Sequence, residues 1–116
     1  MNFETTQLCD QYSKKVKVAA PIFKNFGGKI TFSGLINTVK VHEDCLLVQN
    51  VLGKPGEGKV LVVDGGGSLR CALVGKVMAQ LATDNGWAGI ILDGCIRDAA
   101  TLAQTNIGIK ALNTYP

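Results

Sequence analysis

The sequence predicts a mixed α/β domain, in which helices flank a partly parallel sheet. Short apolar runs that suit buried strands, such as residues 59–63 and 88–92, alternate with stretches of helical periodicity. Glycine-rich turns separate these segments, as expected between regular elements. The order strand, helix, strand, helix, strand in the second half of the chain favours parallel strands joined by right-handed crossovers.

Length and composition indicate one compact domain, which we expect to span residues 1–116. Hydrophobic residues make up 47% of the chain and charged residues only 18%, which leaves room for a subunit interface. The basic residues are scattered, so we expect no direct contact with nucleic acid. The polar N-terminus and the lack of a long apolar run predict a cytoplasmic protein without membrane contact. The four cysteines form no C-x-x-C pair, which argues against a zinc site and suits reduced thiols.

The first half of the chain predicts helical and extended elements in turn. A threonine near the N-terminus could cap a first helix. In a following short helix, Leu47, Val48 and Val51 would share one face. The expected elements are a helix from 5 to about 12, extended segments at 29–32 and 35–41, and a helix at 44–52.

The second half predicts strands at 59–63, 88–92 and 108–112, a helix ending near 85–86, and a short helix at 99–104. The start of the longer helix is ambiguous. Ser68 could cap it, but Gly75 would then lie inside the helix at a cost of about 1 kcal/mol relative to alanine. Alternatively, residues 68–74 are extended or irregular and Gly75 opens the helix. The pattern alone leaves both possibilities open.

Three stretches could carry chemistry. The run 64–68 (Asp-Gly-Gly-Gly-Ser) lacks the dinucleotide and phosphate-loop spacings, so a tight turn is favoured there. Residues 75–78 (Gly-Lys-Val-Met) could bind a carboxylate if a helix begins there, although the pattern alone favours an ordinary helix segment. Arg97 and Asp98 follow a predicted strand and could bind an anion and Mg²⁺ or Mn²⁺. Equally, Asp98 could cap the next helix while Arg97 pairs with a surface acid. The single histidine, His42, is expected at the surface.

Several motifs together resemble the RraA-like family over essentially the whole chain. The most distinctive are 60–70 (VLVVDGGGSLR), 85–89 (NGWAG) and 93–98 (DGCIRD), and shorter matches occur at 5–10, 26–28, 32–34 and 38–40. The resemblance implies a swivelling β/β/α-type domain that assembles as a homotrimer, with active sites between subunits.

One branch of the family implies a divalent-metal-dependent class II aldolase. It would cleave 4-hydroxy-4-methyl-2-oxoglutarate to pyruvate and also decarboxylate oxaloacetate. Carried over to this chain, the family motif implies that Arg97 binds the keto oxygen and the enolate, and that Asp98 is the direct ligand of Mg²⁺ or Mn²⁺. Backbone N–H groups would bind the pyruvate carboxylate at a helix start formed by Gly75, Lys76, Val77 and Met78. On this reading Gly75 opens the helix.

The other branch of the family inhibits ribonuclease E by binding the nuclease and its partner proteins, without catalysis. Members that regulate in this way can lack the aspartate of the Arg-Asp pair, so the presence of both Arg97 and Asp98 favours an enzyme. Two departures weigh against activity. Lys76 stands where the aldolases commonly carry an acidic residue, and a protonated lysine repels a metal ion. The family domain also continues past the equivalent of Pro116, so we expect a C-terminally short domain.

Overall fold

Two sheets and four helices form the domain in the computed structural model, which describes residues 4–116. The larger sheet has the strand order β1-β7-β5-β3-β2 and the smaller one the order β4-β6-β8. The larger sheet consists of β1 (Lys24–Asn25), β2 (Ile36–Lys40), β3 (Val60–Asp64), β5 (Gly89–Asp93) and β7 (Gly108–Ala111). The smaller sheet consists of β4 (Ala72–Val74), β6 (Cys95–Ile96) and β8 (Asn113–Thr114). The helices are α1 (Thr5–Gln11), α2 (Leu46–Leu52), α3 (Lys76–Asp84) and α4 (Ala99–Leu102).

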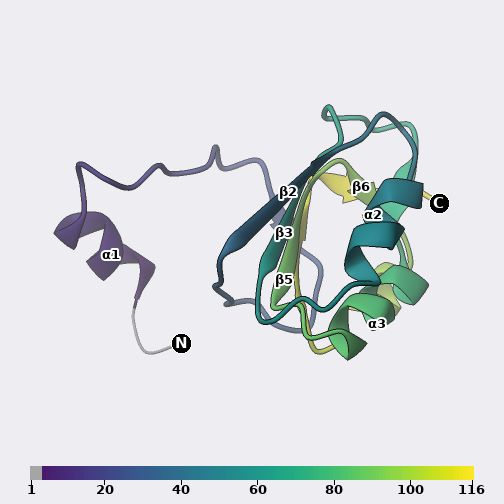
Figure 1. Cartoon of the computed structure of the whole chain (residues 1–116). Coiled ribbons are helices and arrows are strands. Elements are labelled where there is room, and N and C mark those ends of the chain that lie inside the picture. Colours follow the sequence, from purple (N-terminus) through teal and green to yellow (C-terminus); the bar gives the residue numbers. More distant parts are fainter. Residues whose placement is uncertain (1–3) are drawn as a thin grey trace.

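The predicted mixed, partly parallel sheet with flanking helices is confirmed. Strands β2, β3, β5 and β7 pair in parallel, and only β1 joins antiparallel, at the β7 edge. Helices α2 and α3 cover one face of this sheet, whereas the N-terminal segment with α1 lies on the other side (Figure 1). No helix within residues 4–116 is long and apolar enough to cross a membrane.

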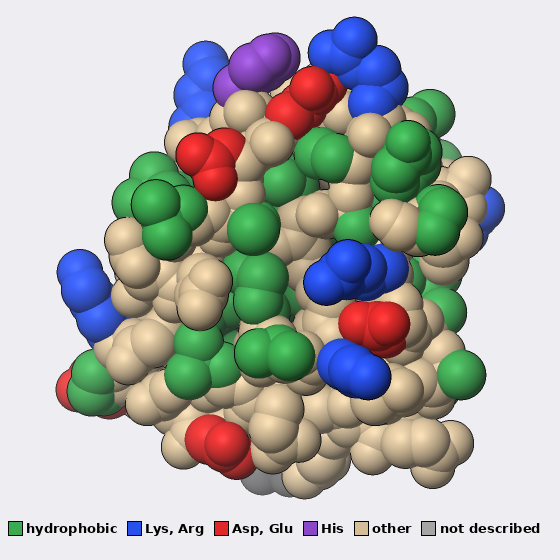
Figure 2. Space-filling view, turned by 90° about the vertical axis from the view of Figure 1, so that its right-hand side faces the viewer, with side chains coloured by type: hydrophobic (Ala, Val, Ile, Leu, Met, Phe, Trp, Pro, Cys, Tyr) green, Lys and Arg blue, Asp and Glu red, His purple; other side chains and the backbone are tan. Residues whose placement is uncertain are grey.

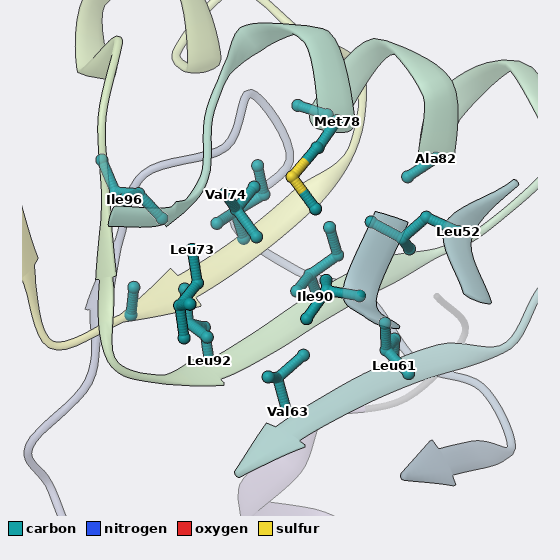
Figure 3. Close-up of a cluster of buried hydrophobic side chains, with 14 of the residues drawn as sticks. Leu52, Leu61, Val63, Leu73, Val74, Met78, Ala82, Ile90, Leu92 and Ile96 are labelled. Carbon is teal, nitrogen blue, oxygen red and sulfur yellow. The ribbon is translucent and has the colours of Figure 1, made fainter. Parts of the chain in front are cut away.

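The hydrophobic core lies between the large sheet and the helices (Figure 3). Alternate residues of β3 and β5 point the same way, because successive side chains of a strand face opposite sides. Leu61 on β3 and Ile90 on β5 are fully buried in this way, against Leu52 of α2 and Met78 of α3. Burying each such side chain contributes roughly 1.5–3 kcal/mol, so this layer holds the helices on the sheet.

Three predictions for the first half of the chain are wrong in detail. The N-cap of α1 is Glu4, whose backbone N–H donates to the Gln7 side chain at 3.4 Å, and not a threonine. The segment 29–32 forms only an isolated bridge at Lys29, because β1 at 24–25 takes the pairing beside β7. In α2 the buried residues are Val48 and Leu52, and Leu47 is exposed.

The ambiguous start of the middle helix is resolved in favour of Gly75. Residues 72–74 form strand β4, Gly75 is the N-cap, and α3 runs from Lys76 to Asp84. The extended alternative prevails because Ala72 and Val74 pair with β6, a partner 22 or more residues further along the chain. Local propensity carries no information on such a pairing.

Candidate active site

A pocket of about 480 Å³ lies where strand β4 passes into helix α3. All six residues that the family motif singled out line this one pocket. Figure 2 shows the side of the molecule on which α2 and α3 lie, and acidic and basic side chains stand beside hydrophobic ones there. The lining residues are Cys45, Ala72, Leu73, Gly75, Lys76, Val77, Met78, Arg97 and Asp98.

The small sheet brings the two halves of this pocket together. Strands β4 and β6 are parallel, so the residues that follow each strand emerge at the same edge. Gly75 follows β4 and Arg97 follows β6, and the Arg97 N–H donates to the Val74 carbonyl at 3.0 Å. The start of α3 and the start of α4 therefore face each other across the pocket.

Asp98 joins these two helix starts. Its Oδ2 accepts the backbone N–H of Lys76 at 3.0 Å, and its side chain is about one-third exposed. Its backbone is left-handed, with φ 59° and ψ 40°, a conformation that aspartate adopts more readily than most residues. Although Asp98 occupies the N-cap position of α4, its side chain makes no capping bond to that helix. The interpretation of Asp98 as a simple helix cap is therefore wrong.

Gly75 allows this close approach. A Cβ at this position would lie 2.9 Å from Oδ2 of Asp98 and 3.1 Å from Nε of Arg97. Its backbone is extended, with φ −132°, so an alanine would have no conformational strain there. The requirement for glycine thus comes from the packing of Arg97 and Asp98 against the backbone.

The first turn of α3 offers N–H groups to an anion. The first N–H groups of a helix have no partner within the helix and carry partial positive charge. The Lys76 N–H donates to Oδ2 of Asp98 at 3.0 Å, and its expected role toward a substrate carboxylate stays a prediction. Within residues 4–116, no carbonyl or side chain accepts the N–H of Val77 or Met78. These two groups are the ones open to a carboxylate.

Two cations and one carboxylate set the charge of the pocket. The Nε of Arg97 lies 3.9 Å from Oδ2 of Asp98, and the arginine side chain is 62% exposed, so this ion pair is weak. Arg97 therefore pairs with the neighbouring aspartate and not with a distant surface acid. Lys76 is exposed, and its ammonium has no carboxylate within 4.0 Å in the described chain.

The donor set allows a loosely held divalent cation. Within residues 4–116 there is no group of three or more His, Cys, Asp or Glu side chains able to enclose a metal. Mg²⁺ commonly keeps several waters and uses only one or two carboxylates together with substrate oxygens. Asp98, the one carboxylate of the pocket, fits that mode of binding.

Sequence reasoning missed a tether beside the pocket. The Arg70 guanidinium donates to the Glu43 carboxylate, from Nε at 2.8 Å, and the Ser68 hydroxyl donates to the same oxygen at 3.1 Å. The bond to Arg70, followed by that to Ser68, holds the pKa of Glu43 below its ordinary value. The tether fixes the loop before α2, where Cys45 lines the pocket. The only signal for it in the sequence was a pair of opposite charges 27 residues apart.

The other candidate residues have contacts that suit a role in the fold and not in binding. In the glycine run, the Gly66 N–H donates to the Asp64 side chain at 3.0 Å, and Gly65 packs against the Asp93 carbonyl, which confirms a tight turn. His42 is exposed, as predicted. Cys95 is buried, and this burial, followed by the nearby Cys71, raises the pKa of its thiol.

Comparisons with known proteins show what the whole chain is similar to. The family model described as "RraA-like: Aldolase/RraA" matches residues 5–116. A protein of Alkalilimnicola ehrlichii, named "Putative 4-hydroxy-4-methyl-2-oxoglutarate aldolase", is 51% identical over 116 residues, which are 100% of this chain and 72% of that protein.

Two solved structures share the fold closely. The RNA-processing inhibitor RraA from Thermus thermophilis has a TM-score of 0.96 and 44% identity, over 100% of this chain and 70% of that one. A structure from Geobacillus kaustophilus, described as an S-adenosylmethionine: 2-dimethylmenaquinone methyltransferase, has a TM-score of 0.95 and 46% identity, over 98% of this chain and 71% of that one. Proteins with one fold thus carry three different functional names, so the function has to be argued from the residues of the pocket and not from the fold.

Proposed function

The chain belongs to the RraA-like family, and we propose that it is a class II aldolase that cleaves 4-hydroxy-4-methyl-2-oxoglutarate to pyruvate. Oxaloacetate decarboxylation would be its second activity. The observation that carries the proposal is the convergence of Gly75, Lys76, Val77, Met78, Arg97 and Asp98 on one pocket, although 18 residues separate Met78 from Arg97 along the chain.

Both reactions form the same intermediate. The bond between C3 and C4 of a 2-oxo acid breaks, and its electron pair moves toward the keto oxygen to give the enolate of pyruvate. In decarboxylation C4 leaves as CO₂, and in aldol cleavage the C4 hydroxyl loses its proton to solvent as C4 becomes the carbonyl of a second pyruvate. The enolate then takes up a proton at C3. A site that stabilises negative charge on that oxygen therefore accelerates both reactions. The pocket offers a guanidinium, two free helix N–H groups and one carboxylate for this task.

Each group has a distinct role in the proposal. The N–H groups of Val77 and Met78 bind the C1 carboxylate of the substrate, and Arg97 donates to the keto oxygen, on which charge develops. Asp98 would hold Mg²⁺ or Mn²⁺, which supplies Lewis acidity toward the same oxygen when bound. Gly75 keeps Asp98 and Arg97 close to the helix start, so that all these donors point at one region.

The test is oxaloacetate decarboxylation by the purified protein with Mg²⁺ or Mn²⁺, with and without EDTA. We expect metal-dependent turnover that falls at least about 100-fold in Asp98→Ala and persists in Asp10→Ala, an exposed aspartate of α1 that serves as the matched control. Binding of Mn²⁺, followed by water proton relaxation, should weaken in Asp98→Ala alone. Folded wild-type protein without turnover would refute the enzyme assignment.

A second candidate function is inhibition of ribonuclease E by protein binding. Two observations favour it: the inhibitor from Thermus is 44% identical to this chain, and Lys76 places a positive charge beside the proposed metal ligand. Purified ribonuclease E should then bind the protein and lose activity, and this inhibition should be unchanged by Asp98→Ala. Inhibition without any oxaloacetate turnover would favour the regulator over the aldolase.

We propose that the protein forms a homotrimer in the cytoplasm. A homotrimer with sites between subunits is supported by family membership and by the apolar side chains that the large sheet leaves exposed near its β2 edge, such as Leu35 at 79% and Ile36 at 67%. We propose a cytoplasmic location because the free cysteines suit a reducing compartment. Sedimentation of the purified protein tests the trimer directly.

A further inference from the structure

The proposed active site carries more positive charge than one carboxylate and one keto group require. Lys76 and Arg97 are its cations, Asp98 is its single carboxylate, and the remaining lining residues carry no charge. The helix start adds further partial positive charge. Without a metal the pocket already favours anions, and a divalent cation increases that preference.

Of the two cations in the pocket, Lys76 is the one that forms no ion pair within the described chain. Asp98 receives the backbone N–H of Lys76 and stands beside the Arg97 guanidinium, while no carboxylate lies within 4.0 Å of the Lys76 ammonium in the described chain. Lys76 also borders the neighbouring pocket between α2 and α3, where the acid is Asp84. The Asp84 carboxylate lies two helical turns away from Lys76 along α3, and it accepts a hydrogen bond from the Gln80 side chain at 2.8 Å. The ammonium is therefore available to a ligand.

We propose that Lys76 binds the second carboxylate of the substrate, so that the site selects 2-oxo dicarboxylates over 2-oxo monocarboxylates. This inference rests on the proposed function, because the first carboxylate and the keto oxygen are assigned there to the N–H groups of α3 and to Arg97. Lys76 lines the same pocket as these two groups and its side chain is exposed, so its ammonium is within the reach of a second carboxylate on the same ligand. An ammonium on a flexible stem can follow carboxylates at slightly different distances.

The two reactions should respond differently to Lys76. In aldol cleavage the second carboxylate keeps its charge throughout, so the ammonium binds substrate and transition state alike. In decarboxylation that carboxylate leaves as neutral CO₂, and the electron pair of the broken bond stays on the enolate. The ammonium then stabilises the ground state more than the transition state, which lowers KM and kcat together.

The first test is a direct binding comparison that needs no turnover. Calorimetry with Mg²⁺ present compares 2-oxoglutarate with 2-oxopentanoate, which has the same five carbons but one carboxylate. We expect wild type to prefer 2-oxoglutarate by about three- to fivefold, as for a partly exposed ion pair. The preference should vanish in Lys76→Met and persist in Lys76→Arg. It should also persist in Lys54→Met, an exposed lysine outside the pocket.

The second test is kinetic. In Lys76→Met, KM for oxaloacetate should rise about three- to fivefold and kcat should rise with it, whereas aldol cleavage should show a raised KM with kcat unchanged. An unchanged preference in Lys76→Met, or a wild type that binds both ligands equally or binds neither, would overturn the inference. If binding follows the expectation while turnover is absent, the proposed reaction fails and the role of Lys76 in binding stands.

Discussion

Replacing Gly75 by alanine should separate activity from stability. The ideal Cβ would lie 2.9 Å from Oδ2 of Asp98, whereas ordinary contacts begin at 3.4 Å, so the carboxylate must retreat by about 0.5 Å. The hydrogen bond of 3.0 Å from the Lys76 N–H would then lengthen beyond useful range. Because misplacement of about 1 Å can cost roughly 100-fold in rate, we expect kcat to fall about 10- to 100-fold.

The folded state should tolerate the same change. Gly75 is extended, so alanine introduces no backbone strain and lowers the entropy of the unfolded chain, which contributes about 0.4–1 kcal/mol of stability. Loss of one partly exposed hydrogen bond costs a similar amount, about 0.5–1.5 kcal/mol. The two effects nearly cancel, and the melting temperature should stay within about 4 °C of wild type.

Steady-state oxaloacetate decarboxylation and thermal unfolding, measured on the same preparations, check this prediction. Gly53→Ala is the matched control, because that glycine has helical angles and its added Cβ would only reach an ordinary contact of 3.4 Å. It should leave both kcat and the melting temperature near wild type. Full kcat in Gly75→Ala would refute the argument that this glycine positions Asp98 and Arg97.

The remaining predictions concern stability and pH. Trp87→Phe should lower the free energy of unfolding by about 1–2 kcal/mol in urea titrations, since the buried indole N–H donates to the Lys54 carbonyl at 3.0 Å; an unchanged midpoint would contradict this role. The Arg70 guanidinium holds the pKa of Glu43 below its ordinary value of 4.5, so the carboxylate stabilises the fold above that value and loses this contribution as the pH falls through its lowered pKa. The difference in melting temperature between wild type and Glu43→Gln should therefore shrink as the pH is lowered from 7 to below 4; a difference independent of pH would show that the ion pair contributes nothing.

Elements with strong local signals were predictable. The runs at 59–63, 88–92 and 108–112 are mainly apolar, with lysines at 59 and 110, as expected of strands covered on both faces, and they correspond to β3, β5 and β7 within one residue. Their order along the chain, with helices between them, also predicted the parallel pairing. The strands β6 and β8 have two residues each, too few for any periodicity, and only the resemblance to a β/β/α-type family hinted at a second sheet.

For the candidate site too, some features were predictable from the sequence and others were not. The sequence by itself determined which residue types were available, namely a glycine before a helix and an Arg-Asp pair after a strand, and the family motif joined them. Only the tertiary structure showed that the Asp98 side chain accepts the Lys76 N–H and makes no capping bond to α4, that Cys45 lines the pocket, and that Arg70 binds Glu43. The physical reason is that these contacts depend on β4 pairing with β6, and a pairing between distant segments is set by the packing of the whole core and leaves no periodic trace in either segment.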